Sequence, residues 1–110
     1  VKLVRQARDY ILVHIGQTIT TEQLAKKLGM NRTYLCKLFS EETGMTINRY
    51  VTQVKMEEAK RLMDITPKPV AEIAEYLGFS SQSYFSYAFK KRMKCAPREY
   101  AANFFSNYES

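Results

Sequence analysis

Residues 25–30 read Ala-Lys-Lys-Leu-Gly-Met, and residues 74–79 read Ala-Glu-Tyr-Leu-Gly-Phe. The correspondence continues beyond the glycines, where Tyr34-Leu35 matches Tyr84-Phe85, Phe39 matches Phe89, and Tyr50 matches Tyr100. Each copy predicts a short helix, a turn opened by glycine and a longer helix, which is the sequence form of a helix-turn-helix. Glycine suits this turn because the chain there needs a left-handed backbone conformation.

Helical periodicity extends outward from both copies, and no strand pattern interrupts it, so we predict an all-α fold of about seven helices. The first helix is expected to be amphipathic, with a stripe of residues at spacings of three and four from Leu3 to His14, and it stops at Gly16. The next three helices are expected over about residues 21–28, 32–43 and 46–63. Their predicted N-caps are Thr20, in a capping box with Gln23, then Asn31 and Thr46.

The second half of the chain predicts three more helices. Pro69 suits the first turn of a fifth helix that ends at Gly78. A sixth follows a cap at Ser80 or Ser81, and a seventh opens at Pro97, with Tyr100 and Phe104 facing inward. In both copies the expected core positions are apolar: Leu24, Ala25, Leu28, Leu35, Leu38, Phe39, Val70, Ile73, Ala74, Leu77, Phe85, Ala88 and Phe89. We predict one domain over residues 1–110, with unit one at about 5–45, a linker helix at about 46–63 and unit two at about 69–106.

Composition narrows the class of protein. The chain has 110 residues, 45% of them hydrophobic, and a formal net charge of +6, which favours an anionic partner such as nucleic acid. No apolar run reaches the ~20 residues of a membrane span, and no signal peptide is visible. The helical pattern begins with the first residues of the sequence, and the first residue is not Met. We therefore expect a fragment of a longer protein. Cys36 and Cys95 are expected to be free thiols, with a disulfide as the alternative.

The longer helix of each copy has an outward face suited to DNA. A helical wheel places Thr33 and Lys37 opposite Leu35, and Ser83 and Tyr87 opposite the apolar face of the later helix. Lysine can donate to guanine, threonine offers a hydroxyl and a methyl, and tyrosine can hydrogen-bond or pack on a thymine methyl. We therefore predict Thr33, Lys37, Ser83 and Tyr87 as base contacts. The alternative for each residue is a solvated side chain.

Residues near the helix starts, together with flanking lysines, suit phosphates. The predicted DNA-backbone contacts are Thr20, Thr21, Asn31, Arg32, Tyr34, Ser80, Ser81, Gln82, Lys90 and Lys91. The helix between the copies, about 18 residues at ~1.5 Å each, spans ~27 Å. That length could hold two recognition helices about one DNA turn apart, ~34 Å.

Other candidate sites are weak. The single histidine, His14, has apolar neighbours and suits packing better than metal binding. Adjacent carboxylates at Glu41-Glu42 and Glu57-Glu58 diverge by ~100° on a helix, which suits solvation better than acid–base work. Phe104-Phe105 with Tyr108 is expected to anchor the core. We predict no catalytic residue, no metal site and no cofactor.

The stretch from Gly78 to Lys91 resembles the signature of the AraC/XylS transcription regulators, which continues to Pro97 and Tyr100. Residues 34–39 with Gly44 resemble the family's first unit, and Ala59 with Leu62 resembles its linker helix. Three positions depart from the family pattern, namely Lys94 in place of Gly, Ala96 in place of Ser or Thr, and Ala101 in place of Arg.

The resemblance implies a bacterial, cytoplasmic regulator domain that binds double-stranded DNA at specific sequences and catalyses nothing. It implies a sensing or dimerisation domain in the full-length protein, leaves RNA polymerase as a second candidate partner and predicts no membrane association. Two other hypotheses remain open: a helical module that binds protein, and a regulatory segment of a larger enzyme. No recognisable motif indicates the operator sequence, the effector, or whether the protein activates or represses transcription.

Overall fold

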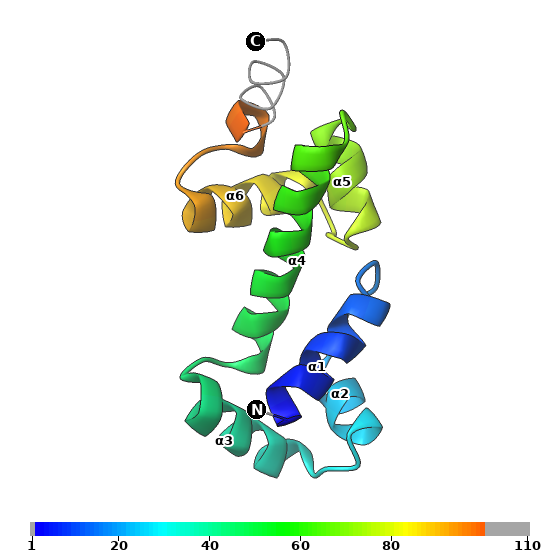
Figure 1. The fold of residues 1–110 in the computed structure, drawn as a ribbon, viewed down its shortest axis with the longest axis vertical. Coiled ribbons are helices and arrows are strands. Elements are labelled where there is room, and N and C mark those ends of the chain that lie inside the picture. The colour runs from blue at the N-terminus through cyan, green and yellow to red at the C-terminus, as the bar shows by residue number, and fades with distance from the viewer. Residues whose placement is uncertain (1, 101–110) are drawn as a thin grey trace. The chain divides into compact units, whose positions relative to one another are not determined.

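The computed structural model describes residues 2–100, and within that range all of its regular secondary structure is helical (Figure 1). The elements are α1 (Lys2–Val13), α2 (Thr21–Lys27), α3 (Arg32–Thr43), α4 (Ile47–Ile65), α5 (Val70–Tyr76) and α6 (Gln82–Met93). A further helical turn starts at Pro97 and reaches Tyr100, the last described residue, so Phe104 and the other predicted C-terminal anchors lie outside this range. The predicted all-α class is confirmed.

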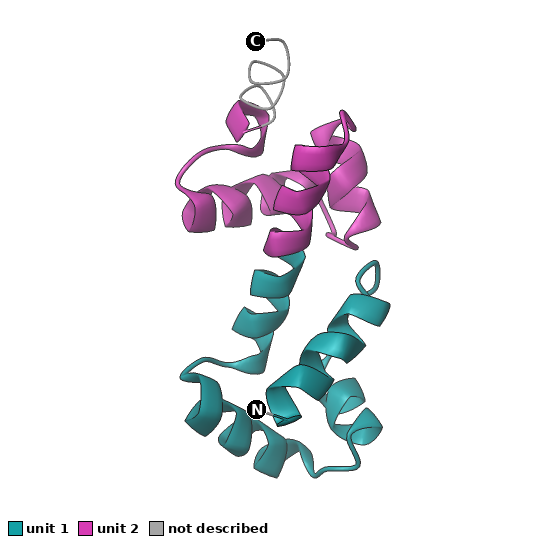
Figure 2. Cartoon of the chain, in the orientation of Figure 1, with its two compact units in different colours: residues 1–55 teal, residues 56–110 magenta. Residues whose placement is uncertain are grey.

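The chain forms two compact units, Val1–Lys55 and Met56–Ser110 (Figure 2). The first nine residues of α4, 47–55, belong to the first unit, and the rest of the helix belongs to the second. The predicted three-part division of residues 1–110 stays a prediction.

The first unit has one apolar core, into which α1, α2, α3 and the start of α4 place side chains. The fully buried residues include Ile11, Leu24, Leu35, Phe39 and Val54. The rings of Phe39 and Tyr50 meet edge to face, with centroids 5.2 Å apart and planes at 67°. This aromatic contact fixes the end of α3 against the start of α4.

The second unit repeats this arrangement with different side chains. Its fully buried residues include Met63, Ile73, Leu77, Phe85 and Phe89. The rings of Phe89 and Tyr100 meet edge to face at 5.9 Å and 71°, as Phe39 and Tyr50 do in the first unit. The two copies of the sequence repeat therefore also pack their buried side chains in the same way.

Side-chain capping explains where α2, α3 and α6 begin. The Thr20 side chain accepts a hydrogen bond from the Gln23 N–H at 3.1 Å, and the Gln23 side chain accepts one from the Thr20 N–H at 3.1 Å. Asn31 and Ser81 cap α3 and α6, so Ser81, rather than Ser80, is the cap of the sixth helix. These bonds satisfy N–H groups that have no partner inside the helix.

Three details differ from the sequence predictions. α4 continues two residues beyond Met63, to Ile65. Pro69 lies at the N-cap of α5 instead of in its first turn, because its ψ of 151° is extended. Four expected core residues are only half-buried: Leu28, Leu38, Val70 and Ala88.

Lys55 is the buried charged residue that the sequence analysis missed. It is 6% exposed, and its Nζ donates a hydrogen bond to the Gln17 carbonyl oxygen at 2.8 Å. Burial lowers the pKa of Lys55 from its ordinary value. The bond ties the loop after α1 to α4 within the first unit.

Candidate nucleic-acid interface

The helices α3 and α6 present the same surface pattern. Residues 31–40 and residues 81–90 follow an identical order of exposed, half-buried and buried side chains, position by position. Leu35 and Phe39 are buried in the first, and Phe85 and Phe89 are buried at the matching places in the second. Each helix therefore holds its unit together with one face and leaves the opposite face free for a partner.

All four predicted base contacts lie on these outward faces. Thr33 and Lys37 are exposed on α3, and Ser83 and Tyr87 are exposed on α6. Tyr87 is 63% exposed, a large value for an aromatic residue. Their predicted position opposite the buried face is therefore confirmed. That they contact DNA bases stays a prediction.

The predicted backbone contacts are also accessible. Of the ten, only Thr21 is half-buried. The other nine are exposed, namely Thr20, Asn31, Arg32, Tyr34, Ser80, Ser81, Gln82, Lys90 and Lys91. Three of these side chains already have a structural role. The oxygens of Thr20, Asn31 and Ser81 accept hydrogen bonds from backbone N–H groups in their own helices.

A hollow of about 320 Å³ gathers part of this set in the first unit. It is lined by Thr20 and Thr21 before and in α2, Arg32 at the start of α3, and Asn48 at the start of α4. Glu22 also lines it and introduces a negative charge. Asn48 and Glu22 were not predicted as site residues, because three helices bring these positions together and no local motif marks them.

The end of α6 concentrates positive charge in the second unit. Lys90, Lys91 and Arg92 occupy its last turn, where cations also interact favourably with the helix dipole. The Lys91 Nζ lies 6.0 Å from the centroid of the Tyr87 ring. Lys91 therefore lies on the flank of α6 and also next to Tyr87 on the outward face of that helix.

The other candidates do not form sites. Glu58 pairs with Arg61 on the surface of α4, and Cys36 and Cys95 are free and half-buried. Within residues 2–100, no group of acidic, histidine and cysteine side chains could hold a metal ion. Among the same residues, no helix is both long and apolar enough to cross a membrane.

Comparison with known proteins identifies the family. The family model described as a helix-turn-helix domain matches residues 24–103. A solved AraC-type DNA-binding domain-containing transcriptional regulator from Chromobacterium violaceum has the same fold, with a TM-score of 0.88, 25% identity, and 94% of this chain and 92% of that chain covered. The chain belongs to the AraC-type helix-turn-helix family.

Two further proteins resemble this AraC-type domain more closely in sequence. The C-terminal domain of AraT, a response regulator from Geobacillus stearothermophilus, is 38% identical, with a TM-score of 0.84 and 94% of this chain and 86% of that chain covered. The Msm operon regulatory protein of Streptococcus mutans is 33% identical over 97 residues, which are 88% of this chain and 35% of that protein. The first curated relatives are much longer than the domain, which covers 25–61% of their length.

Proposed function

We propose that this AraC-type domain binds double-stranded DNA at specific sequences and so regulates transcription, with α3 and α6 as recognition helices. The observation that carries the proposal is the identical exposure pattern of residues 31–40 and 81–90. Two helices of one chain leave the same face open, and polar or cationic side chains lie on it. An α-helix with such a face fits the major groove of B-DNA.

The outward side chains divide into two roles. Lys37 can donate to the O6 and N7 acceptors of a guanine, and Thr33, Ser83 and Tyr87 can read neighbouring base edges or thymine methyls. Arg32 and the lysines at the end of α6 suit phosphates, which fix orientation but carry no sequence information. The hollow lined by Arg32, Thr21 and Asn48 is a suitable place for one such phosphate.

Two recognition helices in one chain allow one molecule to read two successive major grooves. The grooves on one face of B-DNA repeat about every 34 Å. If both helices bind one duplex face, inserting about half a DNA turn between the two half-sites moves one of them out of reach. Binding should then weaken by much more than the ~1–3 kcal/mol of a single mismatch.

Selection of bound duplexes from random DNA tests the proposal directly. A sequence-specific domain should enrich two short conserved blocks separated by a fixed spacing. With about 5–8 phosphates neutralised, the logarithm of the binding constant should fall against the logarithm of salt with a slope of roughly −5 to −7. No enrichment, together with a flat salt titration, would rule out DNA as the partner.

The remainder of the regulator is also part of the proposal. The relatives that the chain matches are longer regulators, so we propose that a sensing or dimerisation domain accompanies this one, and that RNA polymerase is a second partner. We propose no catalytic role for the domain itself, since the role that its outward side chains suit is recognition.

A further inference from the structure

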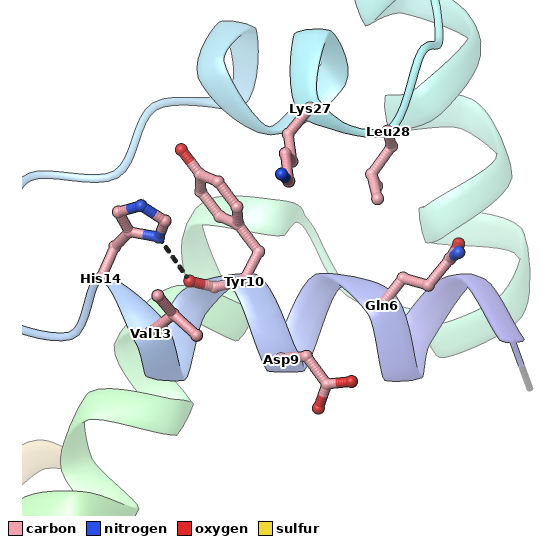
Figure 3. A pocket seen from close by; sticks show the side chains of 7 residues that line it. All are labelled: Gln6, Asp9, Tyr10, Val13, His14, Lys27 and Leu28. Carbon is pink, nitrogen blue, oxygen red and sulfur yellow. Dashed lines mark hydrogen bonds between the residues drawn. The ribbon is translucent and has the colours of Figure 1, made fainter.

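A second hollow of the first unit lies between α1 and α2 and is unrelated to the proposed DNA contacts. Its volume is about 430 Å³, within the range of roughly 300–1,000 Å³ typical of small-molecule sites. None of the predicted base or phosphate contacts lines it. Figure 3 shows the lining side chains, which α1 and the end of α2 provide.

One wall of this hollow is aromatic and held in place. The rings of Tyr10 and His14 stack with centroids 4.2 Å apart and planes at 30°. The His14 Nδ1 lies 2.9 Å from the Tyr10 carbonyl oxygen, and with its proton on Nδ1 the imidazole donates to that oxygen (Figure 3). The bond fixes the ring and leaves Nε2 available to a ligand. Leu28 and Val13 add aliphatic surface, and Val13 is 78% exposed.

A positive charge is directed at this wall. Figure 3 shows the Lys27 ammonium group pointing from α2 into the space between Tyr10 and Leu28. Lys27 forms no ion pair with any residue of the range 2–100. The one carboxylate that lines the hollow, Asp9, points away from α2. The hollow therefore combines an aromatic wall with a cation that forms no ion pair within the described residues 2–100.

We propose that this hollow binds a small carboxylate that carries a flat apolar body. The apolar body would lie against Tyr10 and Leu28, and the carboxylate would accept a charge-assisted hydrogen bond from Lys27. Such a ligand would bridge α1 and α2. Because Lys27 and Leu28 directly precede the turn at Gly29 that leads to α3, the ligand would also brace the base of a recognition helix.

Titration of the ¹⁵N-labelled chain with 3-phenylpropanoate, followed by NMR chemical shifts, tests the proposal. We expect saturable shifts confined to the lining of this hollow, with a dissociation constant of about 0.1–5 mM for a ligand of this size. The neutral 3-phenylpropanamide, which lacks the charge, and acetate, which lacks the ring, should each bind about tenfold more weakly or worse. Lys27→Gln should weaken binding of the carboxylate by about tenfold, whereas Lys26→Gln, an exposed neighbour outside the hollow, should leave it unchanged.

Four results would overturn the proposal: no saturation by about 20 mM, equal affinity for the acid and its amide, shifts that centre on another part of the chain, or equal affinity of Lys27→Gln and the unaltered chain for the acid. The comparison of the three ligands uses the unaltered protein, so it decides the matter even if a variant folds poorly. A ligand that binds Lys27→Gln as tightly as the unaltered chain would show that the ammonium group takes no part.

Discussion

Lys94 ends α6 in the same left-handed backbone conformation that Gly44 adopts at the end of α3, with φ of 68° and 75°. Each donates its N–H to the carbonyl oxygen four residues earlier, Lys94 to Lys90 at 2.9 Å and Gly44 to Ser40 at 2.8 Å. A residue with a Cβ is strained in this conformation and glycine is not. The departure from the family pattern at Lys94 is therefore tolerated by the fold at a cost in free energy.

Lys94→Gly should raise the free energy of unfolding by about 0.5–1 kcal/mol, because it removes that strain. Urea denaturation at neutral pH measures the change. Lys94→Ala keeps the Cβ, so it should give no comparable gain. Gly44→Ala should lower stability by about 1 kcal/mol through backbone strain alone, since a Cβ at Gly44 would meet no atom within 4 Å. Equal stability of Lys94→Gly and the unaltered chain would contradict the prediction.

Lys37 and Lys91 carry the same charge, but replacing each with alanine should affect DNA binding differently. If Lys37 reads a guanine, Lys37→Ala should cost about 1–3 kcal/mol on the selected site and relax the preference at one base position. Lys91→Ala should weaken all sequences about equally and reduce the salt slope by about one. Fluorescence anisotropy with the selected duplex and its single-base variants separates the two outcomes. Equal losses on every sequence would mean that Lys37 contributes only charge.

Glu22 should oppose DNA binding. Its carboxylate lines the hollow that Arg32 and Asn48 share, where we place a phosphate. Glu22→Gln should therefore tighten duplex binding about two- to fivefold at low salt, with a smaller gain at high salt. Asp9→Asn makes the same change in net charge outside that hollow and serves as the control. A gain of the same size in both variants would reflect net charge and not a phosphate at this place.

The hydrogen bond between Tyr100 and Asp64 should make stability depend on alkaline pH. The Tyr100 hydroxyl donates to the Asp64 carboxylate at 2.7 Å. Burial, followed by this bond and the nearby carboxylate charge, raises the pKa of Tyr100 from 10.0 to about 12. Between these values the unfolded chain loses the proton and the folded chain keeps it, so stability should fall as pH rises through this window.

Tyr100→Phe should lose that part of the pH dependence. The measurement is the difference in urea midpoint between the variant and the unaltered chain on either side of the window, which cancels the contribution of the other tyrosines. Asp64→Asn should shrink the effect without removing the ring. A constant difference between Tyr100→Phe and the unaltered chain across the whole window would contradict the assignment.

Local signals explain what the sequence predicted well. The Thr20–Gln23 capping box, the Asn31 cap and the glycine after α3 are all encoded within a few residues, and the bounds of α2 and α3 follow from them. The outward faces followed from helical periodicity, because a residue buried in the unit fixes the direction of its neighbours.

Contacts between distant residues explain what was missed. Lys55 reads as a surface lysine, yet it donates to Gln17, 38 residues earlier. Asn48 joins Arg32 only because the starts of α3 and α4 meet at one hollow. Asp64 and Tyr100 are 36 residues apart, and neither lies in a motif that predicts their hydrogen bond. Such pairs depend on tertiary packing, which periodicity alone does not specify.

The matched exposure of residues 31–40 and 81–90 also makes the outward sides of α3 and α6, the two proposed recognition helices, interchangeable. Thr33 and Lys37 occupy the same places on α3 as Ser83 and Tyr87 on α6, and none of the four contributes to a core. Exchanging these pairs should therefore leave both units folded. If these side chains contact bases as proposed, evolution can change the DNA sequence that each half of the chain binds one side chain at a time, while the buried faces that make the fold remain unchanged.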